Sequence, residues 1–140
     1  MARADKRQLI RAALRAREKA VAPHSRFSVG AAFLTENGRI ITGANVESAS
    51  YGLTCCAERV ALFKALTAGE REFRAIAVVA AIPGGPTPCG ACRQLLAEYA
   101  GKARVWTADA NRPERVREFS VRELLPKPFL FFPGDSDLRK

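Results

Sequence analysis

Three of the four cysteines occupy positions from which they could bind one metal ion together. Cys89 and Cys92 are separated by two residues and follow Pro88, while Cys56 lies far upstream and is followed two residues later by Glu58. Thiolates are preferred ligands of zinc, and a site with only three protein ligands keeps a fourth position for water. The pattern therefore predicts a catalytic zinc centre with a carboxylate beside it.

The combined pattern is more specific than a C-x-x-C pair alone. A metal ligand, any residue and a Glu, followed downstream by Pro-Cys-x-x-Cys, is the signature of zinc-dependent nucleobase deaminases, in which three cysteines can replace the His and two Cys. Zinc lowers the pKa of its water to near 7, and the hydroxide can attack C4 of a cytosine ring. Glu58 would move the proton to ring N3 and help ammonia leave, which is worth roughly 10²- to 10⁴-fold.

Charge around the zinc also needs an explanation. Three thiolates on Zn²⁺ leave one negative charge, which opposes ionisation of the bound water. Both ligand segments open predicted helices, whose N-termini favour thiolate over thiol. Arg59 follows Glu58 directly, and we hypothesise that it hydrogen-bonds the sulfurs and draws off this charge.

Other interpretations of the cysteines and of the histidine stay open. Cys55 could complete a closed structural zinc site, although that would leave Glu58 without a role. A redox pair formed by Cys89 and Cys92 would not need Cys56. Cys55 is most simply a small buried thiol. His24, the one histidine of the sequence, is interpreted as a loop residue far from the ligand segments.

The hydrophobic pattern divides the chain into helices and strands. Apolar residues recur close to every 3.6 positions over 5–20, which predicts an amphipathic helix. Asn37-Gly38 is a hairpin signal, Thr54 is a candidate helix cap, and Gly69 is a candidate left-handed helix stop. Further strands are expected over 27–35, from 40 onward, and over 75–81, 104–108 and 115–119, and further helices over 56–67 and 89–99.

This order of elements predicts an α/β fold with three layers, α-β-α, built on a five-stranded mixed sheet. Only residues 109–114 separate the last two expected strands, which is too short for the crossover of a parallel pair. The last two strands should therefore be antiparallel. The length of 140 residues suits one hydrophobic core, so we expect a single domain over 1–140.

The composition is ordinary for a globular domain, with 48% apolar and 26% charged residues. No apolar run approaches the roughly 20 residues that cross a bilayer, and we find no secretory signal, so we expect a cytoplasmic protein without membrane contact. The net charge is +9, and residues 1–26 hold eight Lys or Arg against Asp5 and Glu18. Such a run more often forms a solvated helix face than a nucleic-acid contact.

Five motifs lie between about 23 and 129, namely Ser25-Arg26-Phe27-Ser28-Val29-Gly30-Ala31-Ala32, Asn45-Val46-Glu47-Ser48-Ala49-Ser50-Tyr51-Gly52, Cys55-Cys56-Ala57-Glu58-Arg59, Pro88-Cys89-Gly90-Ala91-Cys92-Arg93-Gln94 and Glu123-Leu124-Leu125-Pro126. Together they are similar to those of the small homotetrameric cytidine deaminases. The resemblance implies a cytidine deaminase-like fold and one zinc ion per chain. It also implies hydrolysis of free cytidine and 2′-deoxycytidine to uridine, 2′-deoxyuridine and ammonia in pyrimidine salvage.

The resemblance also assigns substrate contacts. Asn45 and Glu47 would hydrogen-bond the ribose 3′-hydroxyl, and Phe27 would pack against the pyrimidine. Backbone groups at Ala57 and Pro88 would bind the edge of the base.

A homotetramer whose active sites share residues between subunits is implied as well. Tyr51 and Phe129 are the candidates for contacts across subunits. Two positions depart from the usual family pattern, namely Ser48 where Asn is common and Cys55 where an aliphatic residue is common.

Three other functions compete with this interpretation. A deaminase of tRNA or single-stranded DNA would suit the basic N-terminus. The resemblance implies, however, that polynucleotide deaminases have a helix between their last two strands, for which residues 109–114 are too short. A deaminase of blasticidin S or of an N4-substituted cytidine would share the metal chemistry and differ in its pocket, where Glu47 favours an ordinary ribose. A zinc-stabilised binding module would need no Glu58.

Overall fold

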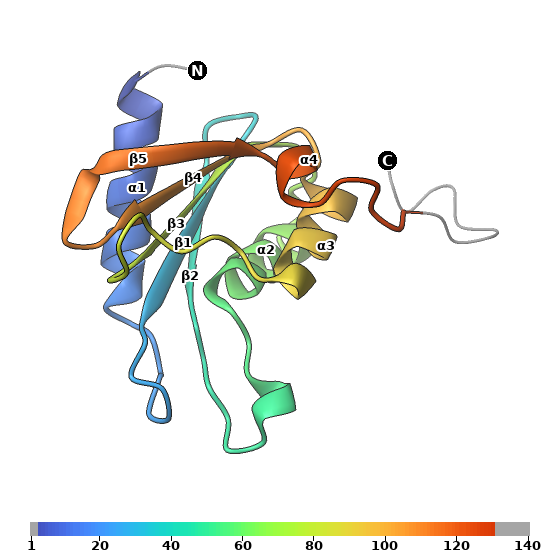
Figure 1. Cartoon of the computed structure of the whole chain (residues 1–140). Coiled ribbons are helices and arrows are strands. Elements are labelled where there is room, and N and C mark those ends of the chain that lie inside the picture. The colour runs from blue at the N-terminus through green and yellow to red at the C-terminus, as the bar shows by residue number, and fades with distance from the viewer. Residues whose placement is uncertain (1–2, 131–140) are drawn as a thin grey trace.

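The computed structural model describes residues 3–130, which form a five-stranded sheet with helices on both faces (Figure 1). The elements in chain order are α1 (Arg3–Arg17), β1 (Val29–Thr35), β2 (Ile40–Ala44), the short 3₁₀ helix η1 (Tyr51–Leu53), α2 (Ala57–Thr67), β3 (Phe73–Ala80), α3 (Gly90–Tyr99), β4 (Arg104–Asp109), β5 (Arg112–Ser120) and α4 (Val121–Leu124).

The strands lie in the order β2-β1-β3-β4-β5. β1 is antiparallel to both β2 and β3, β3 is parallel to β4, and β4 is antiparallel to β5. β2, β3 and β4 therefore all run in the same direction. The expected mixed sheet is confirmed, and so is the antiparallel last pair, whose turn consists of Ala110 and Asn111 alone.

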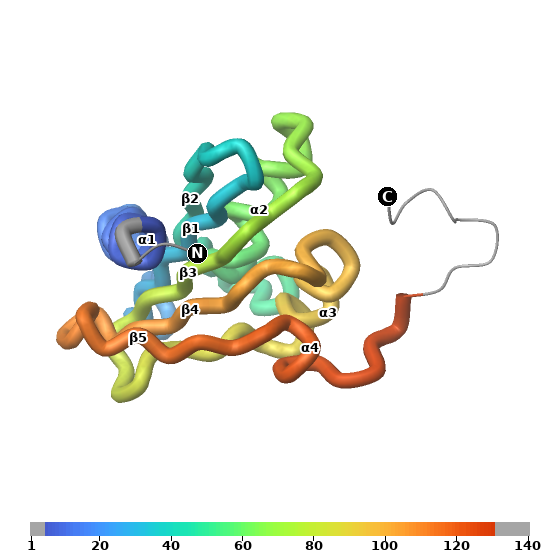
Figure 2. The backbone as a smooth tube through the Cα atoms, turned by 90° about the horizontal axis from the view of Figure 1, so that it is seen from above, coloured from blue at the N-terminus to red at the C-terminus, as the bar shows by residue number. Residues whose placement is uncertain are grey.

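The three layers follow from the alternation of side chains along each strand. On β1, Ala31 and Phe33 belong to the core under α2 and α3, whereas Ala32 and Leu34 belong to the core under α1. Figure 2, which looks from above, places α1 on one side of the sheet and α2 and α3 on the other. The continuous apolar run of β3 is buried on both faces because each face carries a helix.

Two glycines let helices approach the sheet more closely than a side chain would allow. A Cβ added at Gly43 of β2 would lie 2.5 Å from the backbone nitrogen of Ala61 and 2.8 Å from the carbonyl oxygen of Ala57, both in α2. A Cβ added at Gly30 of β1 would lie 1.9 Å from the carbonyl oxygen of Ala13 in α1. Both helices therefore rest directly on strand backbone at these points.

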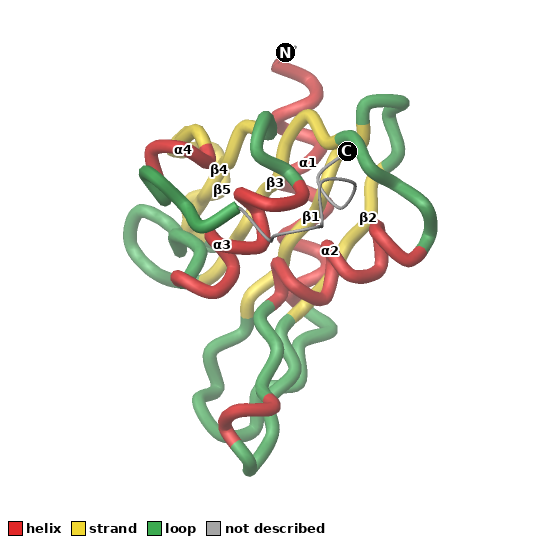
Figure 3. Tube along the Cα trace, turned by 90° about the vertical axis from the view of Figure 1, so that its right-hand side faces the viewer, coloured by secondary structure: helices red, strands yellow, loops and turns green. Residues whose placement is uncertain are grey.

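The segments that follow α1 and β2 extend together beyond the end of the sheet (Figure 3). Val46 joins them, because it forms a bridge with Val21 in one segment and with Cys55 just before α2. These bridges fix the loop that carries Glu47 next to the start of α2.

Local signals were correct in most places but not at every helix end. Gly38 and Gly69 adopt positive φ values of 92° and 95°, as the hairpin and helix-stop signals predict. The expectation for Thr54 is wrong: the N-cap of α2 is Cys56, and the Thr54 hydroxyl instead accepts a hydrogen bond from the Ser48 backbone nitrogen at 3.1 Å.

The beginning of β5 and two short helices also differ from expectation. β5 begins at Arg112 rather than at residue 115. The polar stretch 109–114 predicted a longer loop, but its last three residues belong to the strand. η1 and α4 were not expected. α4 is stabilised by a capping box in which Ser120 and Glu123 satisfy each other's backbone groups. No helix within residues 3–130 has the length and apolar character needed to span a membrane.

A glutamate on the outer strand anchors the buried tryptophan. Trp106 is fully buried, and its indole nitrogen donates to Glu118 at 2.6 Å. Glu118 also pairs with Arg104 at 2.7 Å and with Lys6 of α1 at 3.5 Å. The hydrogen bonds from Arg104 and Trp106 lower the pKa of Glu118 from 4.5 to about 2. This carboxylate therefore links the outer strand, the buried core and α1.

Replacing this carboxylate should destabilise the fold in a pH-dependent way. Glu118→Ala leaves the Trp106 N–H without its acceptor, so the free energy of unfolding at pH 7 should fall by about 2 kcal/mol. Because the pKa is lowered on folding, the stabilisation is present above about pH 4.5 and is lost as pH falls toward 2. Urea unfolding at pH 7 and pH 3 measures both effects.

Glu114→Ala is the matched control. Glu114 is exposed on the same strand, and its side chain makes no hydrogen bond or ion pair within the described residues. It should change the free energy of unfolding by less than about 0.5 kcal/mol. Equal losses in the two variants would contradict the role given to Glu118.

Candidate metal centre and active site

The candidate site lies where two helices begin at the same edge of the sheet. β2 and β3 run in the same direction, so the chain leaves both strands at one edge, and the next α-helix after each strand begins there. α2 begins at Ala57 with Cys56 as N-cap, and α3 begins at Gly90 with Cys89 as N-cap. Neither cysteine makes a side-chain capping hydrogen bond, which leaves both sulfurs available.

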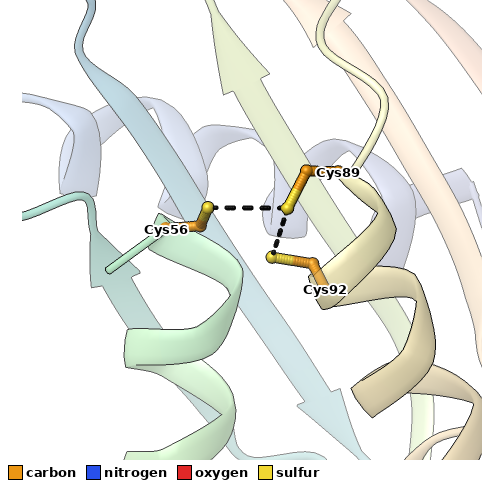
Figure 4. A group of neighbouring side chains, drawn as sticks. All are labelled: Cys56, Cys89 and Cys92. Carbon is orange, nitrogen blue, oxygen red and sulfur yellow. Dashed lines mark hydrogen bonds between the residues drawn. The ribbon is translucent and has the colours of Figure 1, made fainter. Parts of the chain in front are cut away.

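The structure brings together the three cysteines that the sequence predicts as ligands. Figure 4 shows Cys56 at the start of one helix facing Cys89 and Cys92 at the start of the other. The Sγ atoms of Cys56 and Cys89 are 3.8 Å apart, those of Cys89 and Cys92 are 3.5 Å apart, and all three lie within 4.8 Å of one another. Within residues 3–130, no other group of this kind occurs.

These distances fit a zinc ion. With Zn–S bonds of about 2.3 Å, tetrahedral geometry separates sulfur ligands by about 3.8 Å, close to the observed spacing. Cys55 is not part of the cluster, although it directly precedes Cys56. The closed four-cysteine site therefore finds no support in the described residues, and three ligands with a free fourth position is the arrangement that the cluster fits.

Proton sharing and a guanidinium control the charge of the sulfurs. A hydrogen bond from Cys92, together with one from Arg59, lowers the pKa of Cys56 from 9.0 to about 5, whereas the same bond raises the pKa of Cys92. Arg59 Nη2 lies 3.3 Å from Cys56 Sγ. The expected contact between Arg59 and a ligand sulfur is thus present in the structure.

Glu58 lies in the first turn of α2 and is only 6% exposed. The pKa of Glu58 is raised from 4.5 to about 7, mainly by burial and also by the charge of Cys56, while a hydrogen bond with Cys92 acts in the opposite direction. A buried carboxyl group that titrates near neutral pH is suited to both accept and donate a proton.

A pocket of about 320 Å³ is lined by two of the predicted substrate contacts, Glu47 and Tyr51. The side chain of Phe27 is 38% exposed. Its backbone nitrogen donates a hydrogen bond to the hydroxyl of Ser25, which lines the pocket. Asn45 is buried and uses its amide to hold the backbone, because it accepts from Val29 N at 2.8 Å and donates to Phe27 O at 2.9 Å. In this structure Asn45 therefore fixes the position of Phe27.

The remaining predicted contacts differ widely in exposure. Ala57 and Pro88 are fully buried at the two helix starts. Tyr51 and Phe129 are 77% and 61% exposed, so this chain alone does not enclose them. Tyr51 lines the same pocket as Glu47.

Three residues have a larger part in the site than the sequence interpretation gave them. His24 is a loop residue, as expected, and it is not part of the sulfur cluster; it does line the pocket with Glu47 and contacts the Tyr51 ring edge-on at 6.1 Å. Ser25 binds Glu47. Arg93 donates to Pro88 O at 2.6 Å and to Leu124 O at 2.8 Å, which ties the Cys89 segment to α4.

A larger hollow of about 720 Å³ lies elsewhere, between α1 and β5. Its lining includes Lys6, Arg7 and Arg11 of the basic N-terminal helix and apolar residues such as Ile10 and Val116. It contains none of the predicted ligand or substrate residues, so its size does not make it the active site.

Comparison with known proteins agrees with the geometry. The sequence model described as the cytidine and deoxycytidylate deaminase zinc-binding region matches residues 3–108. A cytidine deaminase of Halalkalibacterium halodurans is 51% identical over 126 residues, which cover 89% of this chain and 94% of that protein.

Solved structures agree in fold. The crystal structure of a cytidine deaminase from Burkholderia pseudomallei is 50% identical, with a TM-score of 0.83 over 92% of this chain and all of that one. The Mycobacterium tuberculosis cytidine deaminase is 38% identical, with a TM-score of 0.77 over 91% of this chain and 98% of that one. A Bacillus cereus protein named blasticidin-S deaminase is 34% identical over 80 residues, covering 51% of this chain and 57% of that protein.

Fold, sulfur cluster and buried carboxyl group together define a zinc-dependent deaminase. The chain belongs to the cytidine and deoxycytidylate deaminase family. Its cofactor is zinc, for which Cys56, Cys89 and Cys92 form the candidate site.

Metal analysis of cysteine variants tests the ligand set. Cys89→Ala should reduce bound zinc from one ion per chain to well below one, because two sulfurs hold the ion weakly. Cys55→Ala is the matched control and should keep one zinc per chain. Atomic absorption on protein dialysed against a weak chelator provides the measurement. Equal zinc loss in the Cys55 variant would contradict the three-ligand site.

Proposed function

We propose that this protein hydrolyses free cytidine and 2′-deoxycytidine to uridine and 2′-deoxyuridine, with release of ammonia. The observation that carries the proposal is the buried carboxyl group of Glu58 in the same helical turn that follows the sulfur of Cys56. The family membership and the similarity to cytidine deaminases over most of the chain support it.

In the proposed reaction, water replaces the amino group at C4 of the base. A zinc ion held by the three sulfurs would supply water that is activated for attack near neutral pH. Glu58 would accept one proton from the attacking water and pass it to ring N3. It would then take the second proton from the oxygen now bonded to C4 and pass it to the amino nitrogen, so that the C4–N bond breaks, the C4 carbonyl forms and ammonia leaves. Arg59 offsets the negative charge of the Cys56 sulfur, and Arg93 fixes the carbonyl of Pro88 at the start of α3.

Substrate recognition is proposed for the pocket around Glu47. Phe27 would pack against the pyrimidine, and Glu47 and Asn45 would serve the ribose hydroxyls. Backbone groups at Ala57 and Pro88 would hold the edge of the base. A carboxylate in the sugar pocket favours a hydroxyl and repels a phosphate, which supports a nucleoside over a nucleotide.

The competing substrates receive less support. Deaminases of polynucleotides, by the resemblance, have a helix between the last two strands, whereas β4 and β5 are here joined by two residues and are antiparallel. A modified nucleoside such as blasticidin S is the second candidate, because a blasticidin-S deaminase is among the relatives. That relative matches only 51% of this chain, which favours the cytidine assignment.

We further infer a cytoplasmic homotetramer that acts in pyrimidine salvage. Exposed apolar side chains cluster on the segments that extend beyond the sheet, and such patches often mark protein interfaces. Tyr51 and Phe129 would then contribute to the site of a neighbouring subunit. Light scattering should give a mass of four chains in solution. The exposed apolar residues of these segments are Val21, Phe27, Val46, Tyr51 and Leu53.

A substrate panel tests the proposed function. Near-ultraviolet absorbance should reveal turnover of cytidine and 2′-deoxycytidine, because loss of the amino group changes the chromophore. Cytosine, dCMP, N4-methylcytidine, blasticidin S and a tRNA should each be turned over much more slowly. Turnover of tRNA or blasticidin S without turnover of free cytidine would overturn the assignment.

Removal of the proposed proton carrier should separate chemistry from metal binding. Glu58→Ala and Glu58→Gln should keep one zinc per chain and lower kcat by roughly 10²- to 10⁴-fold, since no sulfur is altered. Zinc analysis and steady-state kinetics on the same preparations measure both quantities. Metal loss in the Gln variant would show that Glu58 is a ligand.

A further inference from the structure

The Ser25 hydroxyl joins two residues that the proposed function assigns to substrate binding. It donates a hydrogen bond to Glu47 Oε2 and accepts one from the backbone nitrogen of Phe27 at 3.0 Å. A serine hydroxyl has one donor and two acceptor positions, so both bonds can form at the same time. The result is a continuous chain from the Phe27 N–H through Ser25 to the Glu47 carboxylate.

The same turn supplies two more hydrogen bonds to Glu47. The backbone nitrogens of His24 and Ser25 both donate to Oε1, at 2.9 and 3.0 Å. An ionised carboxylate has about four acceptor positions, two on each oxygen. Three are occupied, both on Oε1 and one on Oε2. One position on Oε2 is left, and Glu47 lines the pocket.

The backbone around this hydrogen-bond network is also fixed. Glu47 N donates to Val21 O at 2.8 Å, and Val21 N donates to Asn45 O at 2.9 Å, so the segment that leads into the turn lies against the loop that carries Glu47. Asn45 holds the carbonyl of Phe27, whereas Ser25 holds its nitrogen. Phe27 is therefore restrained on both sides, and Ser25 is the restraint that also reaches Glu47.

Hydrogen bonds from Ser25 lower the pKa of Glu47 below its usual value of 4.5. The carboxylate is consequently ionised at neutral pH and can only accept hydrogen bonds. A sugar hydroxyl that meets its remaining position must donate, which is the chemistry of a free ribose hydroxyl and not of a phosphate oxygen.

We propose that Ser25 is a positioning residue of the nucleoside site: its hydroxyl orients Glu47 so that one Oε2 acceptor position faces a sugar hydroxyl, and it holds Phe27 in register with that contact. This inference rests on the proposed deamination of cytidine. It predicts that the effect of Ser25 depends on the sugar, because Ser25 acts through Glu47.

The test compares cytidine with 3′-deoxycytidine, which lacks the hydroxyl assigned to Glu47. Ser25→Ala should raise KM for cytidine about tenfold with kcat within about twofold, the signature of lost uniform binding. The tenfold change corresponds to about 1.4 kcal/mol, near the net value of one hydrogen bond to a charged group. On 3′-deoxycytidine the same variant should change kcat/KM less than about threefold.

Three further variants make the test specific. Ser25→Thr keeps the hydroxyl and should stay within about threefold of the unmodified protein on both substrates. Ser28→Ala is the matched control, since its hydroxyl makes no hydrogen bond inside the described part of the chain. In a Glu47→Gln background, adding Ser25→Ala should have little further effect on cytidine, because the two residues act as one unit. Zinc content and melting temperature are measured for each variant.

The outcomes separate this inference from the proposed function. Equal losses on both substrates, full additivity with Glu47→Gln or failure of the Thr variant to restore KM would each overturn the role of Ser25 while leaving deamination intact. Absence of turnover of any nucleoside by the unmodified protein would overturn the proposed function and this inference with it.

Discussion

The common direction of β2 and β3 is the constraint on which the site depends. Both strands are antiparallel to β1, so both release the chain at one edge of the sheet, and α2 and α3 begin there. Each helix then uses its N-cap and third residue as a pair: Cys56 with Arg59, and Cys89 with Cys92. These two positions face each other at any helix start, as in a capping box. Two ordinary helix ends therefore produce three converging sulfurs and a guanidinium.

The electrostatics of the site follow from the same arrangement. Helix N-termini carry partial positive charge and stabilise thiolates, and Arg59 adds a full positive charge next to Cys56. Glu58 directly precedes Arg59 in the same turn but is buried, so the pKa of Glu58 is raised whereas the pKa of Cys56 is lowered. Neighbouring residues thus acquire opposite tendencies to ionise. That contrast allows a metal-binding sulfur and a proton-carrying carboxyl group to share one turn.

Sequence was sufficient where the determining physics is local or periodic. The buried run of β3, the hairpin at Gly38, the helix stop at Gly69 and the C-x-x-C pair all depend on neighbours a few positions apart. The N-cap of α2 was missed because Thr54 is taken up by the Ser48 loop, a competition that no helix signal reveals. Ser25 was missed as well, because its partner Glu47 is 22 residues away. Such long-range hydrogen bonds become visible only once the loops are folded together.

Gly43 takes no part in the chemistry, but it affects the position of α2, and therefore of Cys56, relative to the other two sulfurs. Its missing side chain lets α2 rest on the backbone of β2 at Ala57 and Ala61, and Ala57 is flanked by Cys56 and Glu58. A single methyl group there would wedge the helix outward and carry one sulfur away from the other two, which stand on a separate helix. A position that contributes no side chain of its own therefore helps to set the spacing between the two helices that carry the sulfurs.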